Sequence, residues 1–274
     1  MGTSAADTEL ARYLVQPVLK AMRVLQIVCD AREPIALNDV VRAAALPKTT
    51  VFRYLRTLAS MRFVEHEPDS DRYRPGIGLW WLSHTSNPYE TLRQICRPEM
   101  KRLQQHFNET VNLAALSGHE VLYLDIIESE RSLRMQAAIG ATDPIHSTAL
   151  GKVLLAFRPA AHRDALLPQV LPRLTPNTII DRAQLLDQLE IIRTTGYALD
   201  LGENEEGSSC LAAPIRDGCD TAVAAISLSA PATRMGGAVR QAMCGRLMNA
   251  CAEISRTLIL RTAEAQSGLA PPVA

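Results

Sequence analysis

A basic helical segment in an otherwise neutral chain constrains the fold of this sequence more than any other feature. The segment from Pro47 to Arg62 contains basic and no acidic residues, whereas the whole chain of 274 residues has a formal net charge of zero. Val51, Leu55 and Leu58 recur at positions i, i+4 and i+7, which share one face of an α-helix. The pattern therefore predicts a helix that packs on one side and presents positive charge on the other.

The flanking sequence predicts two further helices and a small hairpin. Apolar residues recur at near-helical spacing from Val15, and Asn38 is a candidate N-cap for a short helix that ends near Ala44. After the basic helix, residues 63–66 and 72–74 are predicted strands, because a turn sequence at 68–71 separates them. Three helices followed by a hairpin indicate a winged helix-turn-helix.

Such a domain binds DNA through the exposed side of its third helix and through its wing. Arginine, lysine, threonine and tyrosine side chains donate hydrogen bonds to phosphates and base edges. A basic helix alone is also typical of an ordinary solvated surface, but the order of three helices and a hairpin favours DNA binding. The candidate DNA-binding residues are Lys48, Thr49, Thr50, Arg53, Tyr54, Arg56, Arg72 and Arg74.

The rest of the chain alternates predicted strands and helices, which indicates an α+β domain on an antiparallel sheet. Strands are expected at residues 110–116, 120–127, 133–138, 197–201, 209–214 and 222–229. Helices are expected at residues 146–157, 159–167, 185–194 and 236–260, with Asp181 and Gly196 as caps of the third. The predicted organisation is a disordered tail (1–14), a DNA-binding domain (15–78), a linker helix (79–97), a second domain (98–262) and a disordered tail (263–274).

Four stretches resemble the IclR family of bacterial transcription regulators. The run ALPKTTVFRYLRTL, at residues 45–58, resembles the turn and recognition helix of that family. Residues 140–152, 196–214 and 223–234 resemble its C-terminal, GAF-like α/β domain, which binds a small-molecule effector. One departure is Gly202, which stands where the family often has an acidic residue, although Glu203 remains.

The resemblance implies an effector-controlled regulator of double-stranded DNA. Family members form dimers through the N-terminal domain and tetramers through the effector domains, and a dimer implies a palindromic operator. The effector is expected to be an organic or aromatic acid, and its identity stays open, as does repression or activation.

The resemblance also implies which residues line the effector pocket: Ala149, Leu150, Asp200 and Cys210. We add His146 as a candidate hydrogen-bonding partner of the effector, although a buried histidine with a structural hydrogen bond is the more usual case. Residues 146–152 begin a predicted helix whose free N–H groups can hold a carboxylate. Ala149 and Leu150 also suit an ordinary helix core. Asp200 suits a core poorly, because a buried carboxylate needs partners.

Three alternatives use some of the same residues. His146, Asp200 and Cys210 offer nitrogen, oxygen and sulfur ligands that suit zinc, but their spacing is irregular. An enzyme built on His146, Ser147, Asp200 and Cys210 lacks a nucleophile elbow or a phosphate-binding loop. A thiol-based redox sensor needs positive charge beside Cys210 or Cys219, and Arg216 lies between them in sequence. We predict no metal, cofactor or catalytic residue.

The sequence also bears on the compartment. Its six cysteines form no C-x-x-C pair, and reduced thiols are usual in the cytoplasm. No apolar run approaches the roughly 18 residues that span a bilayer, and the first residues lack the pattern of a signal peptide. We therefore expect a cytoplasmic protein that does not bind membranes.

Overall fold

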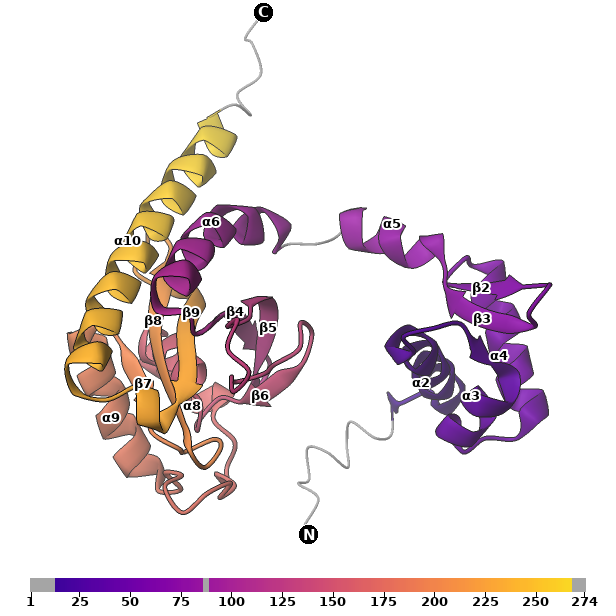
Figure 1. Ribbon diagram of the computed structural model, residues 1–274, viewed down its shortest axis with the longest axis horizontal. Helices are drawn as coiled ribbons and strands as arrows, with labels where there is room; N and C mark the ends of the chain where they lie inside the picture. Colours follow the sequence, from indigo (N-terminus) through magenta and orange to yellow (C-terminus); the bar gives the residue numbers. More distant parts are fainter. Residues whose placement is uncertain (1–12, 86–88, 268–274) are drawn as a thin grey trace, which may run out of the picture. The chain divides into compact units, whose positions relative to one another are not determined.

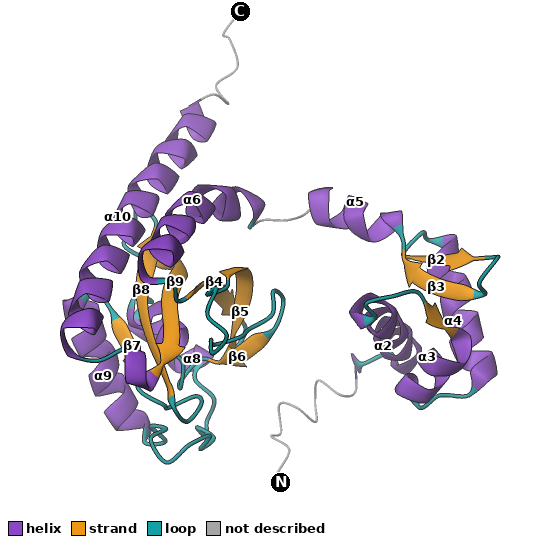
Figure 2. Cartoon of the chain, in the orientation of Figure 1, coloured by secondary structure: helices purple, strands orange, loops and turns teal. Residues whose placement is uncertain are grey.

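The chain forms two compact units, which the computed structural model describes over residues 13–85 and 89–267. Figure 1 labels the helices and strands, and Figure 2 shows that the first unit is mainly helical and the second surrounds a sheet. Each unit has its own buried apolar core. The predicted division into a small N-terminal and a larger C-terminal part is therefore present in the fold.

The first unit is a winged helix-turn-helix, as the sequence predicts. Its three strands form an antiparallel sheet in the order β1-β3-β2, and its first three helices enclose the core. The elements are α2 (Gln16–Asp30), β1 (Ile35–Ala36), α3 (Leu37–Ala44), α4 (Lys48–Ser60), β2 (Val64–Glu67), β3 (Arg72–Pro75) and α5 (Ile77–Thr85).

Helix α4 is set in place by its apolar face and its first turn. The carbonyl of Pro47 accepts the N–H groups of Thr50 and Val51 at 2.9 and 3.0 Å. Val51, Leu55 and Leu58 are buried in the core, as their spacing predicts. The expected N-cap of α3 is wrong: α3 begins at Leu37, so Asn38 lies inside its first turn and makes no capping bond.

The predicted linker helix (79–97) differs from the structure. Two helices occupy this stretch: α5, which ends at Thr85, and α6 (Glu90–Phe107). Leu92 and Cys96 of α6 are buried in the core of the second unit, so this part of the stretch belongs to that unit. Helical periodicity alone does not show which core a helix packs against.

The second unit is built on one antiparallel sheet with the strand order β6-β5-β4-β9-β8-β7. All neighbouring strands in it pair antiparallel, which confirms the predicted class. Its strands are β4 (Thr110–Ser117), β5 (Glu120–Ile127), β6 (Thr142–Pro144), β7 (Ala198–Asp200), β8 (Ser208–Arg216) and β9 (Ala222–Pro231). Its remaining helices are α7 (Ala149–Ala156), α8 (Ala160–Leu166), α9 (Arg182–Thr195), the 3-10 turn η1 (Ala232–Arg234) and α10 (Gly237–Ser267).

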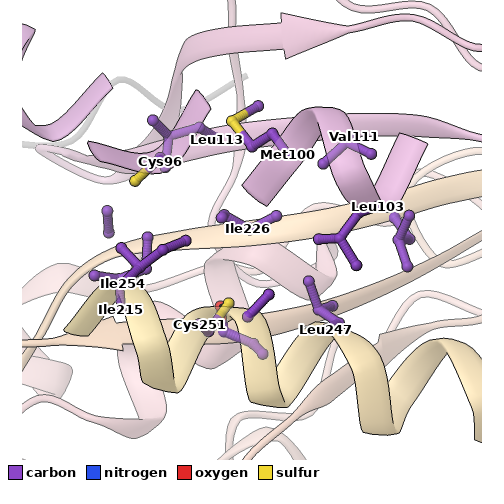
Figure 3. Close-up of a cluster of buried hydrophobic side chains, with 14 of the residues drawn as sticks. Cys96, Met100, Leu103, Val111, Leu113, Ile215, Ile226, Leu247, Cys251 and Ile254 are labelled. Atoms are coloured by element: carbon purple, nitrogen blue, oxygen red, sulfur yellow. The ribbon is translucent and has the colours of Figure 1, made fainter. Parts of the chain in front are cut away.

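Helices cover both faces of this sheet. One core joins α6 and α10 to one face through side chains such as Met100, Ile226 and Cys251, which Figure 3 shows pointing toward one another. A second core joins α7 and α9 to the opposite face through side chains such as Val153 and Leu189. Side chains alternate between the two faces along a strand. Helices on both faces therefore bury both sets of strand residues.

Three expectations for the second unit are wrong. Residues 133–138 form no strand; side chains bond this segment instead, because the hydroxyl of Thr110 and the guanidinium of Arg234 donate to the carbonyls of Met135 and Leu133. The edge of the sheet is instead the short strand β6. The helix expected from His146 begins at Ala149, and the tail expected from residue 263 is helical through Ser267.

The close contact at Gly151 generates a stability prediction. A Cβ atom at Gly151 would lie 2.1 Å from the carbonyl oxygen of Ile145, which is backbone and cannot rotate away. Gly151→Ala should therefore lower the free energy of unfolding of the second unit by about 2–3 kcal/mol. The matched control is Gly245→Ala, at an exposed position of α10 with open space around it, which should raise it by about 0.5–1 kcal/mol. Chemical denaturation measures both, and equal effects would contradict the clash.

Candidate functional site

The outward face of α4 carries side chains that donate hydrogen bonds. The buried positions fix its orientation, so Lys48, Thr49, Arg53 and Arg56 are exposed, whereas Thr50 and Tyr54 are half-buried. Among the described residues, no ion pair or side-chain hydrogen bond engages Lys48, Arg53 or Arg56. This face therefore keeps its positive charge available to a polyanion.

The two candidate arginines of the wing are already engaged. The Arg74 guanidinium donates to Glu65 Oε2 from Nε and Nη2, at 3.0 and 2.8 Å, and lies 3.5 Å from Glu67. Arg72 donates to the carbonyl of Pro34 at 2.8 Å. The structure thus brings the α4 candidates together on one face and gives the wing arginines internal partners, a difference that residue type cannot reveal.

A cavity of about 60 Å³ lies between the sheet and the start of α7 in the second unit. A bound water needs roughly 10–15 Å³ of such space, so the cavity has room for about four to six waters or for a ligand of similar size. Four of the five predicted effector residues line it: Ala149, Leu150, Asp200 and Cys210.

The start of α7 supplies hydrogen-bond donors to this cavity. Thr148 caps the helix by accepting the N–H of Gly151 at 3.0 Å. The N–H groups of Ala149 and Leu150 have no acceptor among the described residues, and both residues line the cavity. Free N–H groups at a helix N-terminus attract anions.

Asp200 places a carboxyl group at the same cavity. It is 2% exposed, and its Oδ1 accepts the N–H of Glu203 at 2.6 Å. Burial raises the pKa of Asp200 to about 6, since a carboxylate loses hydration inside the protein. The carboxyl group is therefore protonated below about pH 6 and mainly ionised above it.

The loop after Asp200 is held by a buried ion pair. Lys152 of α7 lies fully buried with its Nζ 2.6 Å from Glu203 Oε1. The hydroxyls of Thr175 and Thr178 donate to the carbonyls of Gly202 and Glu203 at 2.6 and 2.7 Å. Lys152 was not among the predicted pocket residues, although it lies only six residues after the predicted helix start.

His146 does not line the cavity, unlike the other candidates. Its Nε2 lies 2.9 Å from the carbonyl oxygen of Pro172, and burial lowers its pKa. Within the described residues, no cluster of potential ligands is suited to a metal ion, so His146, Asp200 and Cys210 do not form one. Burial raises the pKa of the Cys210 thiol to about 12, which disfavours the thiolate that a redox sensor needs.

Sequence reasoning missed the polar floor of the cavity. Asn112 of β4 and Ser227 and Ser229 of β9 line it, as does Tyr123, whose hydroxyl donates to Asp143 Oδ2 at 2.7 Å. One sequence signal could have revealed these residues. Polar residues stand two apart in otherwise apolar strands, and this spacing places them on the same face of the sheet.

Comparison with known proteins agrees with both units. Residues 17–68 match the IclR helix-turn-helix domain, and residues 88–256 match the C-terminal domain of bacterial IclR transcriptional regulators. The chain is 32% identical to the HTH-type transcriptional regulator KdgR of Escherichia coli over 251 residues, which are 91% of this chain and 95% of the relative. It is 35% identical over 230 residues to KdgR of Dickeya chrysanthemi, covering 84% and 75% of the two chains.

Solved structures show the same architecture. The IclR protein of Thermotoga maritima superposes with a TM-score of 0.75 at 30% identity, covering 88% of this chain and 98% of that one. An IclR homologue of Microbacterium hydrocarbonoxydans, solved in complex with 4-hydroxybenzoate, gives a TM-score of 0.75 at 28% identity with the same coverage.

The fold and the two sites define a DNA-binding transcription regulator with a C-terminal effector-binding domain. The chain belongs to the IclR family of bacterial transcriptional regulators. Within the described residues, no helix combines the length and apolar character that crossing a membrane requires.

The raised pKa of Asp200 generates a pH prediction. Between the pKa of about 3.9 in the unfolded chain and about 6 in the folded protein, only the folded state binds this proton, so stability falls as pH rises. Asp200→Asn removes that loss and keeps an oxygen for the N–H of Glu203. The variant should therefore gain on the order of 2 kcal/mol over the native protein between pH 4 and 6.5.

Urea denaturation at a series of pH values measures this difference. The control is Asp187→Asn, which changes an exposed aspartate of α9 and should show no such trend. A difference between Asp200→Asn and the native protein that stays constant with pH would contradict the assignment.

Proposed function

We propose that the exposed face of α4 reads a palindromic operator and that a small carboxylic acid bound in the cavity controls this binding. The observation that carries the proposal is the cation-bearing face of α4, whose charges have no ion-pair partners among the described residues. The contacts proposed for base edges and phosphates come from Lys48, Thr49, Thr50, Arg53, Tyr54 and Arg56. Arg72 and Arg74 contribute less, because internal acceptors hold them.

The chemistry of the cavity supports an acid as effector. The free N–H groups of Ala149 and Leu150 can donate to a carboxylate. Asp200, once protonated, can donate a further hydrogen bond, and Cys210 adds a partly buried wall. The homologue solved with 4-hydroxybenzoate holds a molecule of this class. We leave His146 out of the contact set, because its ring nitrogen is bonded to Pro172.

Exposed apolar side chains near the start of α2 support a dimer, and a dimer would bind a palindromic operator. The start of α2 and the residues before it expose large apolar side chains that a monomer would leave in water: Tyr13, Leu14, Val15, Val18, Leu19 and Met22. Contiguous apolar surface of this kind marks protein interfaces. We propose that two copies pair there, which would present two α4 helices to two half-sites.

No observation favours catalysis. A nucleophile mechanism would need His146 and Ser147 to converge on Cys210. Instead, the Ser147 hydroxyl donates to Asn204 Oδ1 at 2.8 Å and His146 bonds Pro172. We therefore propose a regulator without enzymatic activity. We further propose that it acts on double-stranded DNA in the cytoplasm.

Replacing one arginine in each part of the domain tests the DNA-binding proposal. Arg53→Ala should weaken binding at least tenfold to operator duplexes that the native protein has selected from a random pool, and it should relax preference at one base pair. Arg74→Ala, the matched control, should change affinity less than about threefold, because Glu65 already holds that arginine. Gel-shift titration measures both, and unchanged binding by Arg53→Ala would refute the assignment.

Acids and their uncharged amides test the effector proposal. A small carboxylate that binds should raise the unfolding midpoint of the protein and change its affinity for operator DNA, whereas the matching amide should do neither. Ala149→Pro removes one N–H at a position where proline fits a helix, so it should weaken acid binding about tenfold. Equal responses to acids and amides, or full affinity in Ala149→Pro, would contradict carboxylate binding at α7.

A further inference from the structure

Polar side chains form one end of the sheet face that lies under α7. Thr110 of β4 faces Ser229 of β9, and Asn112 faces Ser227 in the strand register. One step further along, Ala114 faces Ala225, and both belong to the apolar core. The face thus changes from apolar to polar where the cavity opens.

Asn112 holds a buried polar atom that nothing in the described protein satisfies. Its side chain is 3% exposed and lines the cavity. The amide nitrogen donates to the hydroxyl oxygens of Ser227 and Ser229, both at 3.1 Å, which uses both of its hydrogens. The amide oxygen Oδ1 is buried and accepts no hydrogen bond from any described residue.

The other hydroxyl donors beside the cavity have acceptors of their own. The Thr110 hydroxyl donates to the carbonyl of Met135, and the Tyr123 hydroxyl donates to Asp143. An unsatisfied buried acceptor costs roughly 1–3 kcal/mol of stability. With its amide nitrogen bonded to both serines, Asn112 leaves its oxygen to be satisfied by a donor from outside the described residues, such as a molecule in the cavity that Asn112 lines.

The cavity therefore has two chemically different ends. The first turn of α7 offers N–H donors without acceptors, and Asn112 on the sheet offers an acceptor without a donor. A carboxylate satisfies the first end and cannot satisfy the second, since it has no hydrogen to give. A hydroxyl group satisfies the second.

We infer that Asn112 is a specificity-determining residue and that the effector is a hydroxy acid whose hydroxyl group donates to Asn112 Oδ1. The inference rests on the proposed function, because it takes acid binding at α7 as given. Sites built to hydrogen-bond a hydroxyl group reject analogues that lack it, because the buried acceptor is then left unpaired.

Paired acids that differ by one hydroxyl group test the inference by isothermal titration calorimetry on the full-length protein. The probes are 3-hydroxypropanoate and propanoate, 4-hydroxybutanoate and butanoate, and 4-hydroxybenzoate and benzoate. In the native protein, the hydroxy acid of at least one pair should bind ten- to a hundredfold more tightly than its partner.

Asn112→Leu replaces the amide by an apolar group of similar size. It should reduce the preference for the hydroxy acid to less than about threefold. Asn112→Ala gives the same readout if the leucine variant does not fold. Asn249→Leu, at an exposed position of α10, is the matched control and should keep the native preference.

The outcomes separate this inference from the proposed function. If acids bind and respond to Ala149→Pro but the paired probes bind equally, the function stands and the role of Asn112 is wrong. A preference that persists in both Asn112 variants also overturns the inference. If no acid binds the native protein, the proposed effector class fails, and the inference fails with it.

Discussion

Burial of the central sheet on both faces is the constraint on which the rest of the second unit depends. Helices α6 and α10 cover one face with an apolar core, in which Val111, Leu113 and Ile226 are fully buried. The α7 face is equally buried, yet it carries Asn112 and Ser227. The cavity lies between the polar end of this face and the start of α7. Buried polar groups need partners, and a ligand in the cavity would supply them.

The first unit follows the same logic with a different outcome. The core fixes one side of α4, and the opposite side gathers cations that no described acidic residue neutralises. The wing has similar residues, but Glu65 and Glu67 flank Arg74. A neutral chain can therefore concentrate uncompensated charge on one helix, and the location of the ion pairs decides which basic residues are free for DNA.

Local signals predicted much of this structure. The spacing of Val51, Leu55 and Leu58 gave the orientation of α4, and Asp181 and Gly196 marked the ends of α9. Features that depend on residues far apart in sequence could not be predicted from local patterns. The hydroxyl of Thr110 donates to the carbonyl of Met135 in the segment 133–138, which is not a strand. Likewise, a ring nitrogen of His146 is bonded to the carbonyl of Pro172. The family resemblance predicted Asp200 and Cys210 as pocket residues. The proposed role of Asn112 depends instead on its amide oxygen, which has no hydrogen bond while the amide nitrogen is bonded to two serines.

The buried polarity that makes the cavity selective also makes the unliganded domain less stable. Burial raises the pKa of Asp200 to about 6, and the oxygens Asn112 Oδ1 and Glu203 Oε2 lack donors among the described residues. A core of apolar residues would avoid these costs, so stability alone does not explain the arrangement. A ligand that meets the free N–H groups and the unpaired acceptor removes part of the cost. Binding free energy is then largest for the molecule whose donors and acceptors match the cavity, and such differential binding is what an effector needs to shift a regulator between states.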